Sequence, residues 1–194
     1  MRIFLAGATG VIGTRLVPLL VAAGHEVAGM TRSAGKADQV RAAGGVPVIC
    51  DVYDLDALTA AVVDFHPDMV MHQLTDLPDD VARIAESGDA NSRIRTEGTH
   101  NLIAAARAAG AKRFLAQSIA WEPAGGRGQV IQDHEAAVLA IDGVVVKYGQ
   151  FYGPGTYYEG ELPAHPRVHI DDAAAQTIPL LEAASGVVIV ADTA

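Results

Sequence analysis

The feature that most constrains the fold is a set of three glycines near the start of the chain, Gly7, Gly10 and Gly13. An apolar segment, residues 2–6, precedes them, and an apolar segment of helical character follows from Val11. Glycine at 7 permits the backbone angles of a tight turn, glycine at 10 leaves room beside the main chain, and glycine at 13 lets a helix pack closely on a strand. This order of strand, glycine turn and helix predicts a phosphate-binding loop in which helix N-terminal amides face the anion.

The rest of the chain alternates short β-branched runs with alanine-rich stretches, a pattern typical of a parallel sheet covered on both faces. We therefore predict the α/β class: a Rossmann-like, doubly wound parallel sheet with helices on both faces, in one domain over residues 1–194. The expected strands are Arg2–Ala6, Glu26–Thr31, Val46–Cys50, Met69–Gln73, Arg113–Gln117, Val144–Tyr148 and Val187–Val190. The expected helices are Val11–Ala23, Asp54–Phe65, Ala90–Ala109, Gln132–Ile141 and Asp171–Ala184.

Composition excludes several classes of partner. The net charge of -9 and the lack of any lysine and arginine cluster argue against nucleic acid. Cys50 is the only cysteine, and His165 and His169 are separated by Pro166 in an expected loop, so we expect no disulfide and no metal site. The sequence has neither an apolar run that could span a bilayer nor a signal-peptide pattern, which predicts a cytoplasmic protein without a membrane partner.

The glycine loop indicates that the ligand is a dinucleotide. Arg32 lies 19 residues beyond Gly13, where an NAD-specific fold carries an acid, and its neighbours Thr31 and Ser33 would help to bind a 2′-phosphate. NADP(H) is therefore favoured over NAD(H), with a solvated arginine as the alternative. Asp51 and Val52 suit an adenine ring or, equally, a helix-capping turn. The expected cofactor-binding residues are Gly7, Thr9, Gly10, Val11, Ile12, Gly13, Thr31, Arg32, Ser33, Asp51, Val52, Gln73, Leu74, Thr75, Gln117, Tyr148 and Gly149.

Five segments, in this order along the chain, resemble the short-chain dehydrogenase/reductase superfamily. They are residues 7–13 (GATGVIG), 97–102 (EGTHNL), 109–114 (AGAKRF), 148–155 (YGQFYGPG) and 168–173 (VHIDDA). The resemblance is to its extended or atypical members, which are similar to NAD(P)-dependent epimerases and dehydratases. It implies a nicotinamide cofactor, a small-molecule substrate and a possible homodimer.

The catalytic residues of that family are only partly present. Its members carry a Ser or Thr after the fifth strand and a Tyr-x-x-x-Lys pair on the next helix, which supply the proton for carbonyl reduction. Ser118 matches the first, but no tyrosine of this chain has a lysine four residues later. Aligning Glu135 with the family's acidic residue places Arg127 and Ile131 where the pair would stand. The resemblance thus implies Ser118 as the polarising residue, with Tyr152, His134 and Glu135 as weaker candidates for the proton donor. His72 is a lone histidine at a strand end, where such residues are often structural, so we assign it no catalytic role.

Aromatic residues gather near the expected substrate side. The segments Glu122–Asp133 and Gly155–Arg167, where relatives carry substrate-binding insertions, are short here, so we expect a minimal substrate-binding portion. An aromatic wall would stack on a planar molecule. The alternative is that these side chains only pack a strand-end turn and a loop. The expected substrate residues are Ser118, Trp121, Phe151, Tyr152, Tyr157 and Tyr158.

These observations predict an NAD(P)H-dependent oxidoreductase that acts on a small aromatic or quinonoid molecule of polyketide type. Hydride addition to a quinone needs less help from a protein acid than reduction of a simple ketone, because it yields a resonance-stabilised phenolate. The resulting hydroquinone can react with oxygen without a flavin or a metal, which gives a monooxygenase-like outcome. The missing pair also permits a non-catalytic sensor that binds the dinucleotide, which is the alternative interpretation. A sugar-nucleotide epimerase or dehydratase is a weaker alternative.

Overall fold

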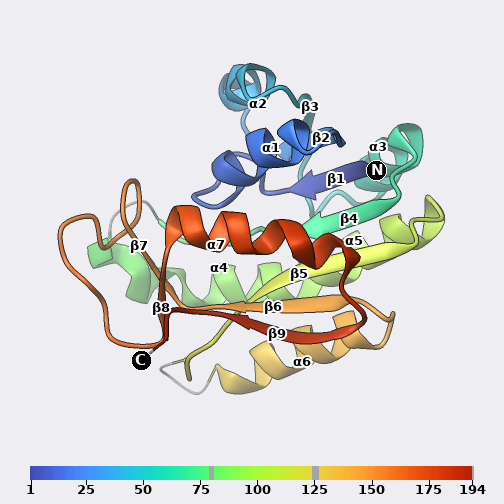
Figure 1. Ribbon diagram of the computed structural model, residues 1–194. Helices are drawn as coiled ribbons and strands as arrows, with labels where there is room; N and C mark the ends of the chain where they lie inside the picture. The colour runs from blue at the N-terminus through green and yellow to red at the C-terminus, as the bar shows by residue number, and fades with distance from the viewer. Residues whose placement is uncertain (79–80, 124–126, 194) are drawn as a thin grey trace.

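A computed structural model describes residues 1–78, 81–123 and 127–193 of the chain. Its centre is a seven-stranded parallel sheet in the order β3-β2-β1-β4-β5-β6-β9, which confirms the predicted doubly wound architecture (Figure 1). A two-stranded parallel sheet pairs β7 with β8 beside the carboxyl edge. The strands are β1 (Arg2–Ala6), β2 (Glu26–Thr31), β3 (Val46–Ile49), β4 (Met69–His72), β5 (Arg113–Ile119), β6 (Val144–Tyr148), β7 (Gln150–Tyr152), β8 (Arg167–His169) and β9 (Gly186–Val190).

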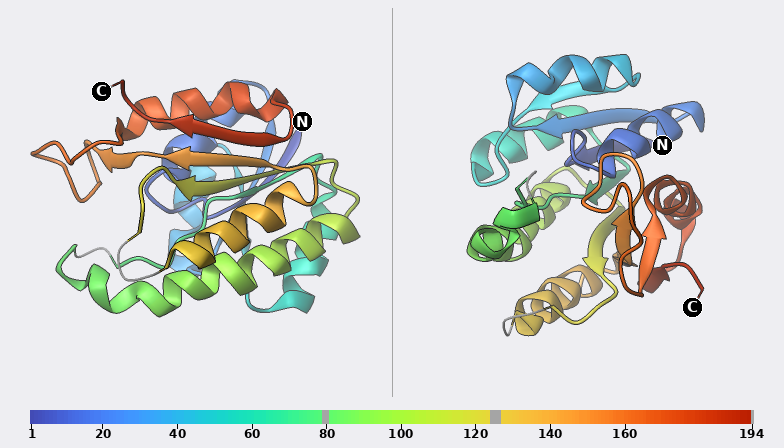
Figure 2. Two further views of the ribbon diagram at one scale, coloured as in Figure 1. Left: turned by 90° about the horizontal axis from the view of Figure 1, so that it is seen from below. Right: turned by 90° about the vertical axis from the view of Figure 1, so that its left-hand side faces the viewer.

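Helices cover both faces of the large sheet (Figure 2). One face packs against α1, α2 and α7, and the other against α3, α5 and α6. The helices are α1 (Gly13–Ala22), α2 (Ala37–Ala42), α3 (Leu55–Phe65), α4 (Gly88–Arg93), α5 (Thr99–Ala108), α6 (Gly128–Leu139) and α7 (Ile170–Thr177). The strand order reverses between β1 and β4, and in sheets of this kind ligands bind at the carboxyl edge beside that reversal.

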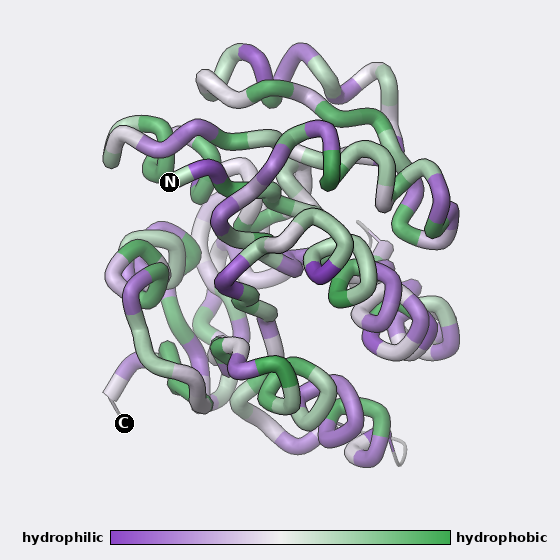
Figure 3. The backbone as a smooth tube through the Cα atoms, turned by 90° about the vertical axis from the view of Figure 1, so that its right-hand side faces the viewer, coloured by the Kyte–Doolittle hydropathy of each residue, from purple (hydrophilic) through white to green (hydrophobic). Residues whose placement is uncertain are grey.

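The core consists of two apolar layers, one on each side of the sheet. Leu5, Met71 and Val146 belong to the layer under α1 and α7, whereas Phe4, Val70 and Val145 belong to the layer under α3, α5 and α6. Neighbouring strand residues face opposite sides of a sheet, so a strand buried on both faces must be apolar throughout. Figure 3 shows this distribution, with hydrophobic colour along the inner strands and mixed colour along the outer helices.

Several predicted boundaries are wrong in detail. The helix expected over Ala90–Ala109 is present as an uninterrupted helical run from Gly88 to Ala108, in which Ile94–Gly98 has π geometry between α4 and α5. Helix α1 starts at Gly13 instead of Val11, because the glycine turn extends through Ile12. The helix expected over Asp171–Ala184 ends as a 3-10 turn at Ile178–Glu182, which contains Pro179. Short apolar elements have weak periodicity, and α2, β7 and β8 were not expected.

Side chains cap two of the described helices. The side chain of Asp54 accepts a hydrogen bond from the amide of Ala57 and so caps the N-terminus of α3. His169 ends β8 and accepts a bond from the Asp171 amide, so it caps the start of α7. Within the described residues, no helix has the length and apolar character required to cross a membrane.

Candidate functional site

The glycine loop connects β1 to α1 at the carboxyl edge of the sheet, on the left in Figure 1. Gly7 has a φ of +96°, and a Cβ there would lie 2.7 Å from the carbonyl oxygen of Gln73. A Cβ at Gly13 would overlap the carbonyl oxygen of Gly7. Gly10 is different, because a Cβ would meet only the Gly7 oxygen, at 3.4 Å. Gly7 and Gly13 are thus required by the fold, whereas Gly10 leaves open space beside the main chain.

The loop presents unused hydrogen-bond donors. The amides of Val11, Ile12 and Gly13 have no main-chain acceptor in the described structure, whereas the Gly10 amide donates to the Gly7 oxygen at 3.1 Å. These amides lie at the N-terminus of α1, where the helix dipole is positive. Gly10 carries no side chain to obstruct an approaching anion. The loop therefore fits a diphosphate held by main-chain groups.

Gln73, which follows β4, supplies a second sign of a ligand-binding site. Its side chain is buried, and neither its amide nitrogen nor its oxygen makes a hydrogen bond of acceptable geometry to the described residues, although it lies near the Tyr148 hydroxyl. Buried amides without partners are uncommon in folded proteins. A polar ligand group at this edge would satisfy Gln73, and the residues present fit a dinucleotide.

The adenine-ribose end of the predicted site has one charged pair. The Arg32 guanidinium is half exposed and contacts the Asp76 carboxylate at 3.1 Å. Thr31 is buried, and its hydroxyl bonds to that of Thr9 at 3.0 Å and accepts from the Ser33 amide at 3.2 Å. The structure therefore brings Thr9, Thr31, Arg32 and Ser33 together, with Asp76 as a neighbour that the sequence did not indicate.

Asp51 and Val52 follow β3, as expected. Val52 is buried, and its carbonyl oxygen accepts a bond from the Asn101 side chain at 2.9 Å. Asp51 is exposed and accepts from the Tyr53 amide at 3.0 Å, a turn that leads into α3. The local geometry includes the capping-type turn, while the exposed carboxylate stays available to a ligand.

A charged cluster surrounds Ser118 near the end of β5. The Ser118 hydroxyl donates to Glu135 Oε1 at 2.5 Å, and the Lys147 ammonium lies 2.9 Å from the same oxygen. Lys147 pairs with Ser118 across β5 and β6, while Glu135 comes from α6. The side chains of Glu135 and Lys147 are 15% and 26% exposed, so the cluster is partly screened from water. We call Ser118, Glu135 and Lys147 the serine cluster.

The sequence did not indicate Lys147. The resemblance places the family's lysine on a helix, four residues after a tyrosine, whereas Lys147 lies on a strand. The one available signal was a lysine inside the apolar run Val144–Tyr148. Such a residue needs a partner when it is buried, and the partner here is Glu135.

A buried chain of hydrogen bonds links β4 to β5 through two histidines. The Leu74 amide donates to His72 Nδ1, and His72 Nε2 donates to the Thr99 hydroxyl at 3.1 Å. Thr99 donates to His134 Nδ1 at 2.7 Å, and His134 Nε2 donates to the Gln117 carbonyl at 2.9 Å. An amide at one end can only donate and a carbonyl at the other can only accept, so every proton in the chain has a defined place.

Both histidines are neutral at pH 7. Burial lowers the pKa of His134 to about 4, and the Arg95 charge acts in the same direction. Burial lowers the pKa of His72 well below its usual value, helped by His134 and Arg95. Because both nitrogens of each ring are occupied, this arrangement favours a structural role for His134 and His72.

Three of the predicted aromatic residues have contacts of their own within the protein. Tyr148 is buried, and its hydroxyl forms a hydrogen bond with the Thr177 hydroxyl at 2.7 Å. Its ring packs on Phe151, with the ring centroids 5.2 Å apart. Tyr152 donates to Asp192 at 2.9 Å. Tyr157 donates to the Pro78 carbonyl, which joins the loop after β7 to the loop after β4.

The remaining predicted residues are spread along the carboxyl edge. Trp121 is 37% exposed after β5, and Tyr158 packs against β7 through a bridge with Tyr152. Gln117 donates to the Leu74 carbonyl at 2.9 Å, and Thr75 is exposed. A Cβ at Gly149 would meet the main chain of Arg167 at 2.7 Å, so packing of β8 requires this glycine. Residues 124–126 of the shortened segment lie outside the described residues.

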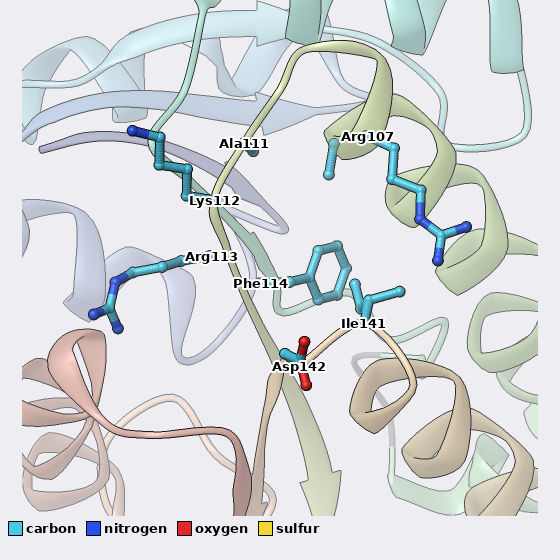
Figure 4. A pocket seen from close by; sticks show the side chains of 8 residues that line it. Arg107, Ala111, Lys112, Arg113, Phe114, Ile141 and Asp142 are labelled. Atoms are coloured by element: carbon cyan, nitrogen blue, oxygen red, sulfur yellow. The ribbon is translucent and has the colours of Figure 1, made fainter.

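A hollow of about 240 Å³ lies at the opposite, amino edge of the sheet (Figure 4). Phe114, Ile141 and Asp142 line it, while the side chains of Arg107 and Lys112 extend in opposite directions. None of its lining residues belongs to the glycine loop or to the serine cluster. It is therefore separate from the candidate site.

Comparison with known proteins agrees with this geometry. Residues 3–135 match the model of the NAD dependent epimerase/dehydratase family. A 3-diazoavenalumate denitrifying reductase from a Streptomyces species is 35% identical over 239 aligned positions, which cover 99% of this chain and 76% of that protein. The chain thus spans about three quarters of that relative.

Solved structures share the fold. A UDP-glucose 4-epimerase from Thermotoga maritima, solved with UDP-glucose, has a TM-score of 0.80 at 17% identity and covers 98% of this chain and 77% of its own. A Thermus thermophilus UDP-glucose 4-epimerase in complex with NAD has a TM-score of 0.79 at 21% identity, over 98% of this chain and 78% of its own. With the family match over most of its length, the chain belongs to the NAD-dependent epimerase/dehydratase family.

Proposed function

We propose that this protein is an NAD(P)H-dependent reductase of a small, planar, electron-poor molecule of the quinonoid or aromatic polyketide type. Membership of the family makes the chain an NAD-dependent enzyme of the oxidoreductase or epimerase kind. The observation that carries the narrower proposal is the serine cluster. It stands at the carboxyl edge without a Tyr-x-x-x-Lys pair, so the usual strong proton donor is missing.

A nicotinamide cofactor, held at the glycine loop, supplies a hydride when bound. The loop amides orient its diphosphate, and the Arg32 side chain, which is half exposed, favours a 2′-phosphate over a bare ribose. We therefore propose NADP(H) ahead of NAD(H). A 2′-phosphate would compete with Asp76 for Arg32.

Ser118 is the proposed polarising residue. Its hydroxyl donates to Glu135, so a substrate carbonyl would have to share or take that hydrogen bond. Lys147 offsets the Glu135 charge, which leaves the serine proton less strongly held by the carboxylate. A quinone suits such a modest donor, because hydride addition to it produces a resonance-stabilised phenolate that water can protonate.

The hydroquinone product can then react with oxygen. One oxygen atom enters the ring, the other leaves as water, and the two electrons come from the hydroquinone, so that a hydroxylated quinone forms. This step uses neither a flavin nor a metal. It gives the monooxygenase-like outcome expected from the sequence.

A second candidate substrate is a diazo compound, and the Streptomyces relative favours it, because that protein is named as a denitrifying reductase of 3-diazoavenalumate. In such a reaction a hydride would replace the diazo group on carbon, and nitrogen would leave as N₂ with the bonding electrons of the carbon–nitrogen bond. A diazonium carbon that receives a hydride needs no proton. This chemistry too would tolerate the loss of the tyrosine.

The test is anaerobic turnover of NADPH with two acceptors, a naphthoquinone and a benzenediazonium salt. We expect absorbance at 340 nm to fall faster than in the protein-free control with at least one acceptor. Ser118→Ala should lower kcat with the quinone, whereas Ser92→Ala, which removes a hydroxyl bonded to the Gly88 carbonyl of α4, should not. Cofactor binding without turnover of either acceptor would favour the sensor alternative instead.

A further inference from the structure

Arg95 is a buried cation for which the described structure contains no hydrogen-bond partner. The residue as a whole is 6% exposed, and its Nε atom is buried without an acceptor among the described residues. Burial lowers the pKa of Arg95 to about 10, so the guanidinium is still charged at neutral pH. An unpaired buried charge is strongly unfavourable, and folded proteins rarely keep one without a use.

The helix that carries Arg95 turns it inward. Arg93 and Glu97, two residues before and after it, form an ion pair on the outer surface at 2.6 Å, with side chains 55% and 42% exposed. Arg95 lies on the opposite side of the same π turn, Ile94–Gly98. Turns of this kind are often found at functional sites. Arg95 therefore faces the sheet and the candidate site instead of solvent.

The polar side chains around Arg95 make their hydrogen bonds to other groups. The acceptor nitrogens of His72 and His134 are occupied by the Leu74 amide and the Thr99 hydroxyl. Glu135 attracts Arg95 electrostatically, but no contact within ion-pair distance joins them, and its oxygens are bonded to Ser118 and Lys147. Arg95 thus has unpaired hydrogen-bond donors and lies close enough to the serine cluster to interact electrostatically with Glu135.

The charges of Arg95 and of the serine cluster do not cancel. Arg95 and Lys147 each contribute a positive charge, Glu135 contributes one negative charge, and both histidines are neutral. A net positive charge in a mostly buried site favours a ligand that brings a negative one. A planar guanidinium pairs best with a planar carboxylate, through two parallel hydrogen bonds.

We infer that Arg95 anchors the carboxylate of an aromatic acid, so that the substrate of this protein is an anion. The inference rests on the proposed function for the location of the reacting group beside Ser118. Arg95 would hold the acid end of the molecule, while its electron-poor part lies at the serine cluster. The site would then reject neutral molecules of the same shape, because they would leave the cation unpaired.

Calorimetric titration of the NADP⁺-loaded protein tests this without turnover. The probes are benzoate, cinnamate and 2-naphthoate, each against its neutral amide of nearly equal shape. We expect at least one acid to bind about ten times more tightly than its amide, and the preference to weaken with added salt. Equal binding of every acid and amide, or no binding of any acid, would overturn the inference.

Two variants and a control locate the effect. Arg95→Met should abolish the preference for the acid while leaving the melting temperature unchanged or higher, because it removes an unpaired buried charge. Arg95→Lys should reduce the preference several-fold, since an ammonium group lacks the planar fork. Arg107→Met, at an exposed arginine near the amino edge, should behave as wild type. A preference that survives in Arg95→Met overturns the inference, and if that variant does not fold, an unchanged preference in Arg95→Lys does so.

These outcomes are separate from those of the turnover assay. A protein that binds aromatic acids through Arg95 but oxidises NADPH with no acceptor would contradict the proposed function and leave the anion site standing. A protein that reduces quinones and does not distinguish acids from amides would contradict the anion site alone.

Discussion

The glycine loop and the serine cluster lie at the same edge of the sheet, but the loop presents main-chain groups whereas the cluster consists of side chains. The loop offers main-chain amides to a ligand, and Gly7 and Gly13 are required there because a Cβ at either position would meet the backbone of Gln73 or Gly7. The serine cluster consists of side chains from β5, α6 and β6, brought together by long-range packing. A main-chain site constrains a short sequence motif, whereas a side-chain site can be assembled from residues far apart in the chain.

The largest expected effect is at Gly13. A Cβ there would overlap the Gly7 carbonyl, so Gly13→Ala should lower the free energy of unfolding by about 3 kcal/mol and abolish NADPH binding. Gly10→Ala is the matched control, because its Cβ finds room in the protein but occupies ligand space. It should unfold like wild type in urea and bind NADPH at least about tenfold more weakly by fluorescence titration. Normal cofactor binding by Gly13→Ala would contradict the view that the loop, unlike the serine cluster, depends on its main-chain geometry.

Lys147→Met tests the serine cluster. Loss of the ammonium leaves Glu135 without its cation, so we expect a drop in kcat of about 100-fold and a loss of about 2 kcal/mol in stability. The double variant Glu135→Gln/Lys147→Met should recover stability but not activity, and a double-mutant cycle on both quantities measures the coupling. Lys112→Met, at an exposed lysine on the amino edge, serves as the control. Full activity in Lys147→Met would remove this lysine from the site.

Acid should destabilise the buried histidine chain. The folded pKa of His134 is about 4, below the value of 6.5 expected for an unfolded chain, so the unfolded state takes up its proton first as the pH falls. Stability is therefore complete above pH 6.5 and is lost toward pH 4, with about 2 kcal/mol from His134 gone at pH 5. Urea unfolding at pH 7 and pH 5 measures this, and His134→Gln should flatten the dependence. An equal dependence in that variant would show that other groups cause it.

The smallest expected effect concerns Arg32. Asp76→Asn frees the guanidinium from an exposed ion pair, so NADPH should bind about two- to threefold more tightly and NADH should bind as before. Arg32→Ala should weaken NADPH binding and spare NADH. Fluorescence titration with both cofactors provides the comparison, and an equal response of the two would argue for a solvated arginine.

Much of the architecture was predictable because it depends on local patterns. Alternating apolar strands and alanine-rich helices identified the parallel sheet, and Gly7, Gly10 and Gly13 identified the loop. The π geometry of Ile94–Gly98 within the long helix was not predictable, since these residues include no proline and the segment packs against α6, which is distant in sequence. The register of β5 with β6, which places Ser118 beside Lys147, could not be predicted from the sequence either.

The sequence by itself therefore determined the backbone-made part of this protein: the strand, the turn and the helix whose amides can hold a diphosphate. Only the tertiary structure decided the chemistry around it, because Lys147 meets Glu135 and Arg95 is turned inward through contacts between residues that are distant in sequence. The physical reason is that backbone conformation depends on neighbouring residues, whereas the partner of a buried charge depends on which elements the fold packs together.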